Sequence, residues 1–192
     1  KYPHMKTLTL KDGHHMPILG LGTSRLLDEE CTEVVKTALE LGYRRIDTAD
    51  MYNNHVAVGT AMKSSGIPRE DIYLVSKVGA SDLARDSVLA CCDRYLKELD
   101  TDYLDLFCVH HPNKNSPIAE TLGAMEELRV EGKIKSIGVS NFTPHHLEDA
   151  MATGVTVVSN QVEFRPSFNQ KELLAFCNEQ SIVLTAYAPL GR

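Results

Sequence analysis

Short apolar runs alternate with longer amphipathic segments along most of the chain. The apolar runs are about five residues long and apolar throughout, which is typical of strands buried on both faces of a parallel sheet. The segments between them are long enough for helices of several turns. The alternation therefore predicts an α/β domain built from repeated strand–helix units.

Residues 6–17 come before this alternation and predict a β-hairpin, because Asp12-Gly13 is a strong turn signal between two extended segments. The predicted strands then cover residues 18–21, 45–49, 72–76, 104–109, 134–139, 157–164 and 182–186. The predicted helices cover residues 28–41, 55–64, 82–99, 117–131, 144–153 and 169–180. Asp28 is expected to cap the first helix and Gly42 to close it.

Repeated strand–helix units fit either an open doubly wound sheet or a closed barrel, and periodicity alone does not choose between them. The positions of polar residues do choose, because they gather at or just after the carboxyl ends of successive strands: Asp47, Tyr52, Lys77, His110, Ser140, Asn141, Gln161 and Tyr187. A barrel with its active site at that face requires this pattern. A doubly wound nucleotide fold would carry a glycine fingerprint, and Gly20-Leu21-Gly22-Thr23 lacks its third glycine.

We therefore predict one α/β domain over residues 1–192, a (β/α)8 TIM-type barrel that is incomplete, with about seven strand–helix units. A complete barrel of this kind has about 250 residues. Seven strands leave the first and the last as open edges, which favour self-association. The sequence is compatible with a fragment, a natural truncation or a barrel completed by another chain.

Composition narrows the class of partner. The net charge of −6 and the pI of about 5.7 argue against nucleic acid or an anionic membrane as partner. The five cysteines form no C-x-x-C motif, as is typical of a reduced intracellular protein. The apolar runs are shorter than the roughly 18 residues of a membrane helix, and Lys1-Tyr2-Pro3-His4 lacks a signal-peptide core. We expect a cytoplasmic protein that acts on a small molecule.

Tyr52 and Lys77 together indicate acid catalysis on an oxygen atom. A nearby ammonium favours the phenolate, so it makes a tyrosine a better proton donor. Asp47 can hold the lysine in its charged form, and His110 can donate a hydrogen bond to a carbonyl oxygen. The sequence shows no activated serine or cysteine nucleophile, so the group suits protonating an oxygen rather than attacking a carbon. The carbon then needs a hydride, which a nicotinamide can supply, and Tyr187 offers an aromatic face to stack on its ring.

These residues resemble the aldo-keto reductases from Thr7 to Gly191. The matching motifs cover residues 19–23, 42–49, 76–78, 105–112, 138–142, 160–163 and 186–191. The resemblance implies NADPH-dependent reduction of an aldehyde or ketone to an alcohol by a tetrad of Asp47, Tyr52, Lys77 and His110. It also implies that NADPH binds at Gly22, Thr23, Asp47, Ser140, Asn141, Gln161, Tyr187, Ala188 and Leu190.

Four positions depart from the family pattern: Ser24, His55, His111 and Ala188. We assign Ser24 and His111 to the substrate pocket beside Tyr52 and His110, where they replace aromatic residues and make the wall more polar. His55 stands where the family has a glutamate. The tetrad itself is intact.

Simpler interpretations exist for several residues. The histidine pairs His14-His15, His110-His111 and His145-His146 are neighbours in sequence, which rarely ligate one ion, so we predict no metal. Cys91-Cys92 predicts one core and one peripheral thiol, and Asn53-Asn54 a plain loop. The alternative to an active reductase is a cofactor-binding regulatory barrel without significant turnover, as in relatives that serve as channel subunits. The intact tetrad favours the reductase, and the incomplete barrel favours the regulatory alternative.

Overall fold

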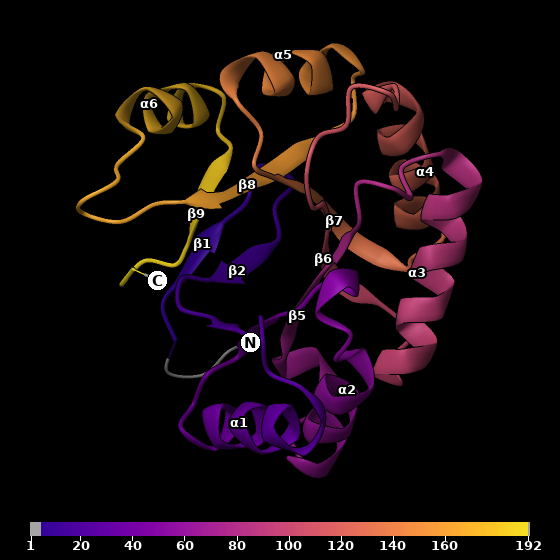
Figure 1. Ribbon diagram of the computed structural model, residues 1–192, viewed down its shortest axis with the longest axis vertical. Coiled ribbons are helices and arrows are strands. Elements are labelled where there is room, and N and C mark those ends of the chain that lie inside the picture. The colour runs from indigo at the N-terminus through magenta and orange to yellow at the C-terminus, as the bar shows by residue number, and fades with distance from the viewer. Residues whose placement is uncertain (1–4, 192) are drawn as a thin grey trace.

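The computed structural model describes residues 5–191, so Lys1–His4 and Arg192 of the predicted domain lie outside the described residues. Seven parallel strands form one curved sheet (Figure 1) and pair in chain order: β3 (Leu21–Gly22), β4 (Arg45–Asp47), β5 (Tyr73–Val78), β6 (Leu104–Val109), β7 (Ile134–Ser140), β8 (Val157–Glu163) and β9 (Val183–Tyr187). A doubly wound sheet reverses its strand order, and this sheet does not. The TIM-type prediction is therefore confirmed.

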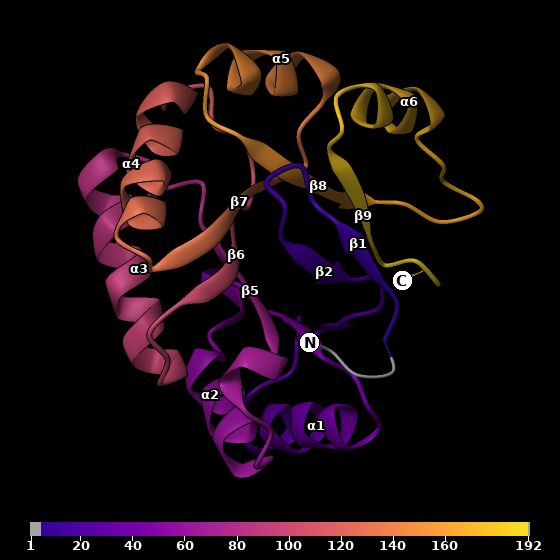
Figure 2. The ribbon, with the colours of Figure 1, turned by 180° about the vertical axis from the view of Figure 1, so that it is seen from behind.

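The helices cover the outer face of the sheet, as Figures 1 and 2 show from opposite sides. They are α1 (Asp28–Glu40), α2 (His55–Ser64), α3 (Arg85–Leu99), α4 (Ile118–Val130), α5 (Pro144–Ala152) and α6 (Lys171–Glu179), with short 3-10 helices η1 (Asp50–Tyr52) and η2 (Arg69–Asp71). A large apolar cluster, including Val58, Leu74 and Phe107, fills the layer between sheet and helices. β5 and β6 are buried along their whole length, as expected for a sheet covered on both faces.

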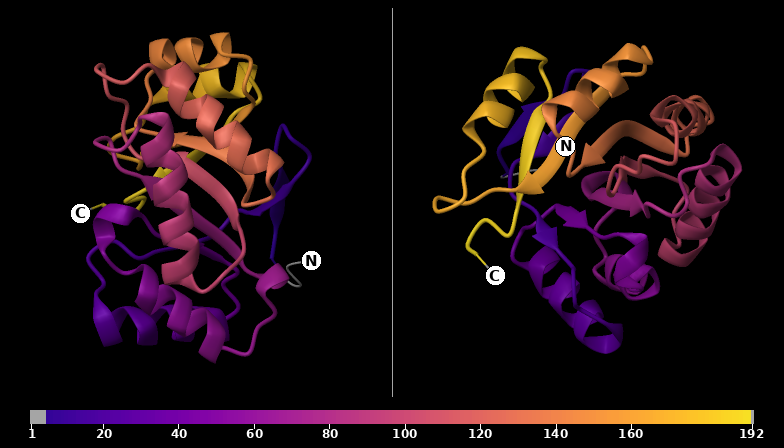
Figure 3. Two further views of the ribbon diagram at one scale, coloured as in Figure 1. Left: turned by 90° about the vertical axis from the view of Figure 1, so that its right-hand side faces the viewer. Right: turned by 45° about the horizontal axis from the view of Figure 1, so that its top comes forward.

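The predicted hairpin is confirmed as β1 (Thr7–Thr9) and β2 (His15–Pro17), which pair antiparallel. It lies at one end of the curved sheet (Figure 3, left). Leu10 and Met16 pack there against Tyr73 and Val75 of β5 in a second apolar cluster. Because Tyr73 begins β5, the hairpin closes the amino end of the barrel and leaves the carboxyl end for the site.

The first predicted strand, residues 18–21, is wrong in extent, since β3 has only Leu21 and Gly22. Ile18 and Leu19 are 52% and 56% exposed. The Ile18 N–H donates to the Lys6 carbonyl at 3.0 Å, so this residue extends the hairpin and not the sheet. In the described part of the chain, β3 and β9 each pair with one strand, and the sheet is open between them.

Two predicted helix starts are also corrected. α3 begins at Arg85 and not at residue 82, because the Asp82 N–H bonds to the Gly79 carbonyl in a turn. Asp28 is the first residue of α1 and caps nothing, since no side-chain bond caps this helix. Gly42 does close it with φ at 97°, a left-handed conformation that glycine adopts freely.

The helices of residues 5–191 are all too short or too polar to span a lipid bilayer.

Candidate active site

The carboxyl ends of the strands bring the predicted tetrad together. Asp47 ends β4, Lys77 is the penultimate residue of β5, and His110 follows β6 directly. Lys77 stands opposite Cys108 of β6 in the register, two residues before His110. Tyr52 ends η1, the turn between β4 and α2. The four side chains thus come from adjacent strands and from one turn beside them.

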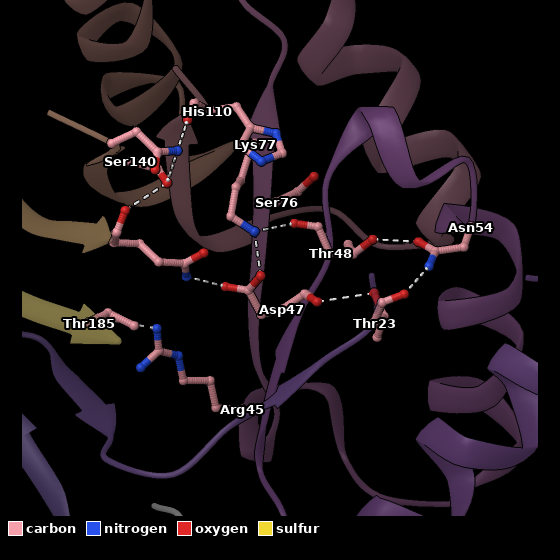
Figure 4. A network of polar contacts seen from close by, with 12 residues as sticks. Thr23, Arg45, Asp47, Thr48, Asn54, Ser76, Lys77, His110, Ser140 and Thr185 are labelled. Atoms are coloured by element: carbon pink, nitrogen blue, oxygen red, sulfur yellow. Dashed lines mark hydrogen bonds and ion pairs between the residues drawn. The ribbon is translucent and has the colours of Figure 1, made fainter. Parts of the chain in front are cut away.

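Lys77 and Asp47 form a buried ion pair (Figure 4). The Lys77 side chain is fully buried, and its ammonium also donates to the Thr48 carbonyl at 2.9 Å. Burial opposes the charge on Lys77, but Asp47 and Tyr52 outweigh it and raise the pKa of Lys77 above its ordinary value. Lys77 is therefore a fixed cation across the neutral pH range.

Tyr52 lies close to both this cation and His110. The Lys77 Nζ atom lies 5.2 Å from the centre of the Tyr52 ring. The Tyr52 and His110 rings meet edge to face, with centres 5.7 Å apart. Tyr52 is half-buried. A phenol, a cation and an imidazole therefore converge on one small region.

His110 is neutral at ordinary pH. Burial, followed by the nearby Lys77 and His111, lowers its pKa to about 4, while Asp47 opposes them. Its ring stacks on that of His111 with centres 4.8 Å apart. A neutral imidazole carries one N–H, which can donate to an oxygen without competing with Tyr52 for the proton. The His110 Nδ1 atom is buried and has no protein partner among residues 5–191.

The side chains predicted to hold the nicotinamide also meet at this end of the barrel. The Ser140 hydroxyl donates to the Gln161 carbonyl at 2.7 Å, and the Gln161 amide donates to Asp47 at 2.7 Å. Asn141 donates to the His110 carbonyl at 2.9 Å and accepts from the Tyr187 hydroxyl at 2.9 Å. Amide and hydroxyl groups beside an aromatic ring suit the carboxamide and the ring of a nicotinamide. The residues present therefore fit this cofactor.

The remaining predicted contacts lie around this group. Gly22 pairs with Asp47 in the register, and the space on its side-chain side is open. Thr23 is buried, and its hydroxyl donates to the Asp47 carbonyl at 3.0 Å. The other predicted contact residues are half-buried or exposed beside the strand ends: Ser24, His111, Ala188 and Leu190.

Sequence reasoning missed the role of Asn54. Its buried amide donates to the carbonyls of Thr23 and Leu26, each at 2.9 Å, and its oxygen accepts from Thr48 at 2.6 Å (Figure 4). It ties the turn that carries Tyr52 to the loop after β3. Its position directly before a predicted helix is a capping signal that could have drawn attention to it.

In the part of the chain that the structure describes, no group of three or more His, Cys, Asp or Glu side chains is placed to bind a metal ion. The five cysteines are free, and Cys92 is buried while Cys91 is only partly so, as predicted.

Two grooves of about 380 and 460 Å³ lie away from the tetrad, one between α2 and α3 and one beside the hairpin.

Comparison with known proteins adds an independent line of observation. A sequence model of the Aldo/keto reductase family matches residues 18–192. The glyoxal reductase of Bacillus subtilis is 43% identical over 186 residues, 96% of this chain and 67% of that protein. The methylglyoxal reductase DkgB of Escherichia coli O157:H7 is 38% identical over 92% of this chain and 67% of its own length.

Solved structures agree with these matches. An aldo/keto reductase from Brucella melitensis has a TM-score of 0.93 and 43% identity, covering 97% of this chain and 73% of that one. An aldo-keto reductase of Bombyx mori, solved in complex with NADP, has a TM-score of 0.89 and 32% identity, covering 96% of this chain and 66% of that one. The chain thus spans about two thirds of the length of most of these relatives.

Proposed function

The chain belongs to the aldo-keto reductase family, and from this membership we propose that its site reduces an aldehyde or ketone to an alcohol with NADPH as hydride donor. The observation that carries the proposal is the convergence of Tyr52, the Lys77–Asp47 ion pair and neutral His110 at one end of the sheet. Small oxoaldehydes are the proposed substrate class, because the names of two relatives specify glyoxal and methylglyoxal.

Each member of the tetrad has a proposed task. His110 donates a hydrogen bond to the carbonyl oxygen and polarises it. Tyr52 then gives its proton to that oxygen, and the buried Lys77 ammonium stabilises the phenolate left behind. Asp47 keeps Lys77 charged and in place. The nicotinamide supplies the hydride to the carbonyl carbon when it is bound.

The cofactor residues have tasks of their own. We assign the carboxamide of the nicotinamide to Ser140, Asn141 and Gln161, and its ring face to Tyr187. Gly22 and Thr23 border the same region, and Ala188 and Leu190 follow β9. NADPH is chosen over NADH from the family likeness and from the neighbour solved with NADP.

The test compares the chain with its Tyr52→Phe variant. NADPH binding is followed by its fluorescence, and reduction of methylglyoxal by the loss of NADPH absorbance. We expect kcat to fall at least about 10³-fold in Tyr52→Phe, while the Kd for NADPH changes less than about twofold, because the hydroxyl acts only as the acid. Binding without reduction by the unaltered chain would instead favour the regulatory barrel.

A further inference from the structure

His55, the first residue of α2, is a buried histidine with both ring nitrogens bonded. Its Nδ1 lies 2.9 Å from Glu98 Oε2, and its Nε2 lies 2.9 Å from the Ser76 hydroxyl. The ring is 3% exposed and packs against Tyr95, with ring centres 4.7 Å apart. Two bonds and a packed face leave this ring one orientation.

The order carboxylate, imidazole, hydroxyl is also the order of a nucleophile with its base. That function is excluded here by access, because Ser76 is fully buried in β5. The groove between α2 and α3 is lined by Glu98 but by neither His55 nor Ser76. The hydroxyl therefore reaches no substrate, and the three residues join elements of the fold.

The contacts continue from Glu98 to the turn that carries Tyr52. Arg94 donates to Glu98 Oε1 at 3.2 Å and to Asp50 Oδ1 at 2.8 Å. Asp50 begins η1 and Tyr52 ends it. At the other end of the chain of contacts, Ser76 directly precedes Lys77 in β5. One polar network thus reaches the η1 turn that carries Tyr52 at one end and the residue before Lys77 at the other.

The turn has little support of its own. η1 is a single 3-10 turn held by two backbone bonds of 3.0 Å, from the Tyr52 N–H to the Ala49 carbonyl and from the Asn53 N–H to the Asp50 carbonyl. Such turns have poor hydrogen-bond geometry and are easily distorted. Asn54 fixes the far side of the turn, and Arg94 binds the Asp50 side chain at its start.

We propose that His55 is a positioning residue: the network Ser76–His55–Glu98–Arg94–Asp50 holds the Tyr52 turn in place against the strand that carries Lys77. The inference rests on the proposed function, because the distance between Tyr52 and Lys77 matters for turnover only if Tyr52 is the proton donor that Lys77 assists. Burial outweighs the pull of Glu98 and lowers the pKa of His55, which fits a neutral ring with one donor and one acceptor nitrogen.

The test uses Arg94→Met, which cuts the link to Asp50 and leaves the buried His55–Ser76 pair intact. Arg129→Met is the matched control, since Arg129 is 45% exposed and Arg94 48%, and each pairs with a glutamate on its own helix. We expect Arg94→Met to lower kcat about tenfold with KM for NADPH within about twofold. Hydrogen exchange at the Tyr52 and Asn53 amides should speed up several-fold, while Arg129→Met changes neither quantity.

His55→Leu removes the centre of the network and should lower kcat about a hundredfold if the variant folds. Equal kcat and equal amide exchange in Arg94→Met and Arg129→Met would overturn the inference. The exchange measurement needs no turnover, so it separates the two proposals. If the unaltered chain fails to reduce methylglyoxal but Arg94→Met still loosens the turn, the proposed function fails and the network's hold on the turn stands.

Discussion

At the scale of single residues, burial decides the charge of His110. The fold favours the neutral imidazole, with the pKa lowered to about 4 from the ordinary 6.5. A base whose pKa is lowered by folding stabilises the protein fully above its unfolded pKa. That stability is lost as the pH falls from about 6.5 toward about 4, because the unfolded chain then binds the proton more readily.

This linkage gives a pH prediction. The free energy of unfolding of the unaltered chain should fall by about 1–2 kcal/mol more than that of His110→Gln between pH 7 and pH 4, allowing for partial solvent screening. Chemical denaturation of both proteins at each pH gives the comparison. Parallel curves for the two proteins would contradict a neutral, buried His110.

The residues that sequence reasoning found and missed differ in a simple way. Asp47, Lys77 and His110 could be placed because each follows an apolar strand, so their meeting depends only on strand order. His55 could not be understood this way. Its partners Ser76 and Glu98 are 21 and 43 residues away, on other elements, and a departure from the family pattern was its only signal.

At the scale of elements, α2 and α3 pack where α2 has a glycine. A Cβ atom at Gly59 would lie 2.6 Å from the Leu99 carbonyl oxygen at the end of α3. That oxygen belongs to the backbone and cannot rotate away. The close approach of these helices matters for the site, since His55 begins α2 and Glu98 lies near the end of α3.

Gly59→Ala should therefore destabilise the chain by about 1–3 kcal/mol through overpacking. Gly123→Ala is the control, because Gly123 lies within α4 with open space on its side-chain side. Alanine there should stabilise by about 0.5–1 kcal/mol through its higher helix propensity. Urea unfolding measures both, and a gain in stability for Gly59→Ala would refute the packing argument.

Element boundaries were less predictable than element types. The pattern located the hairpin, the α-helices and the strands of residues 5–191, but it missed the 3-10 helices η1 and η2, and α3 begins three residues after the predicted start. Asp82 was expected inside that helix, and its backbone instead bonds within a turn to Gly79. Ile18 and Leu19 are apolar enough for a strand, yet the hairpin takes the Ile18 N–H and leaves both side chains exposed. Tertiary bonds of this kind leave no periodic trace in sequence.

At the scale of the whole molecule, the order of the strands places the chemistry. Because each strand pairs with the next one in the chain, all carboxyl ends share one rim, and the hairpin fills the opposite end. Arg45 lies below the tetrad within the sheet, and its guanidinium reaches Thr185 of β9 at 3.4 Å (Figure 4). Contacts across the interior therefore tie β4, which carries Asp47, to the last strand, which carries Tyr187.

The central claim is that Tyr52 protonates a carbonyl oxygen while hydride passes from the nicotinamide to the carbonyl carbon. The most direct measurement is isotope transfer from NADPH in which both hydrogens of the reactive ring carbon are replaced by deuterium, with methylglyoxal as acceptor and mass spectrometry of the alcohol. The account predicts one deuterium on the new alcohol carbon with the unaltered chain, and at least about 10³-fold slower labelling with Tyr52→Phe. An alcohol without deuterium, or equal labelling rates in the two proteins, would contradict it.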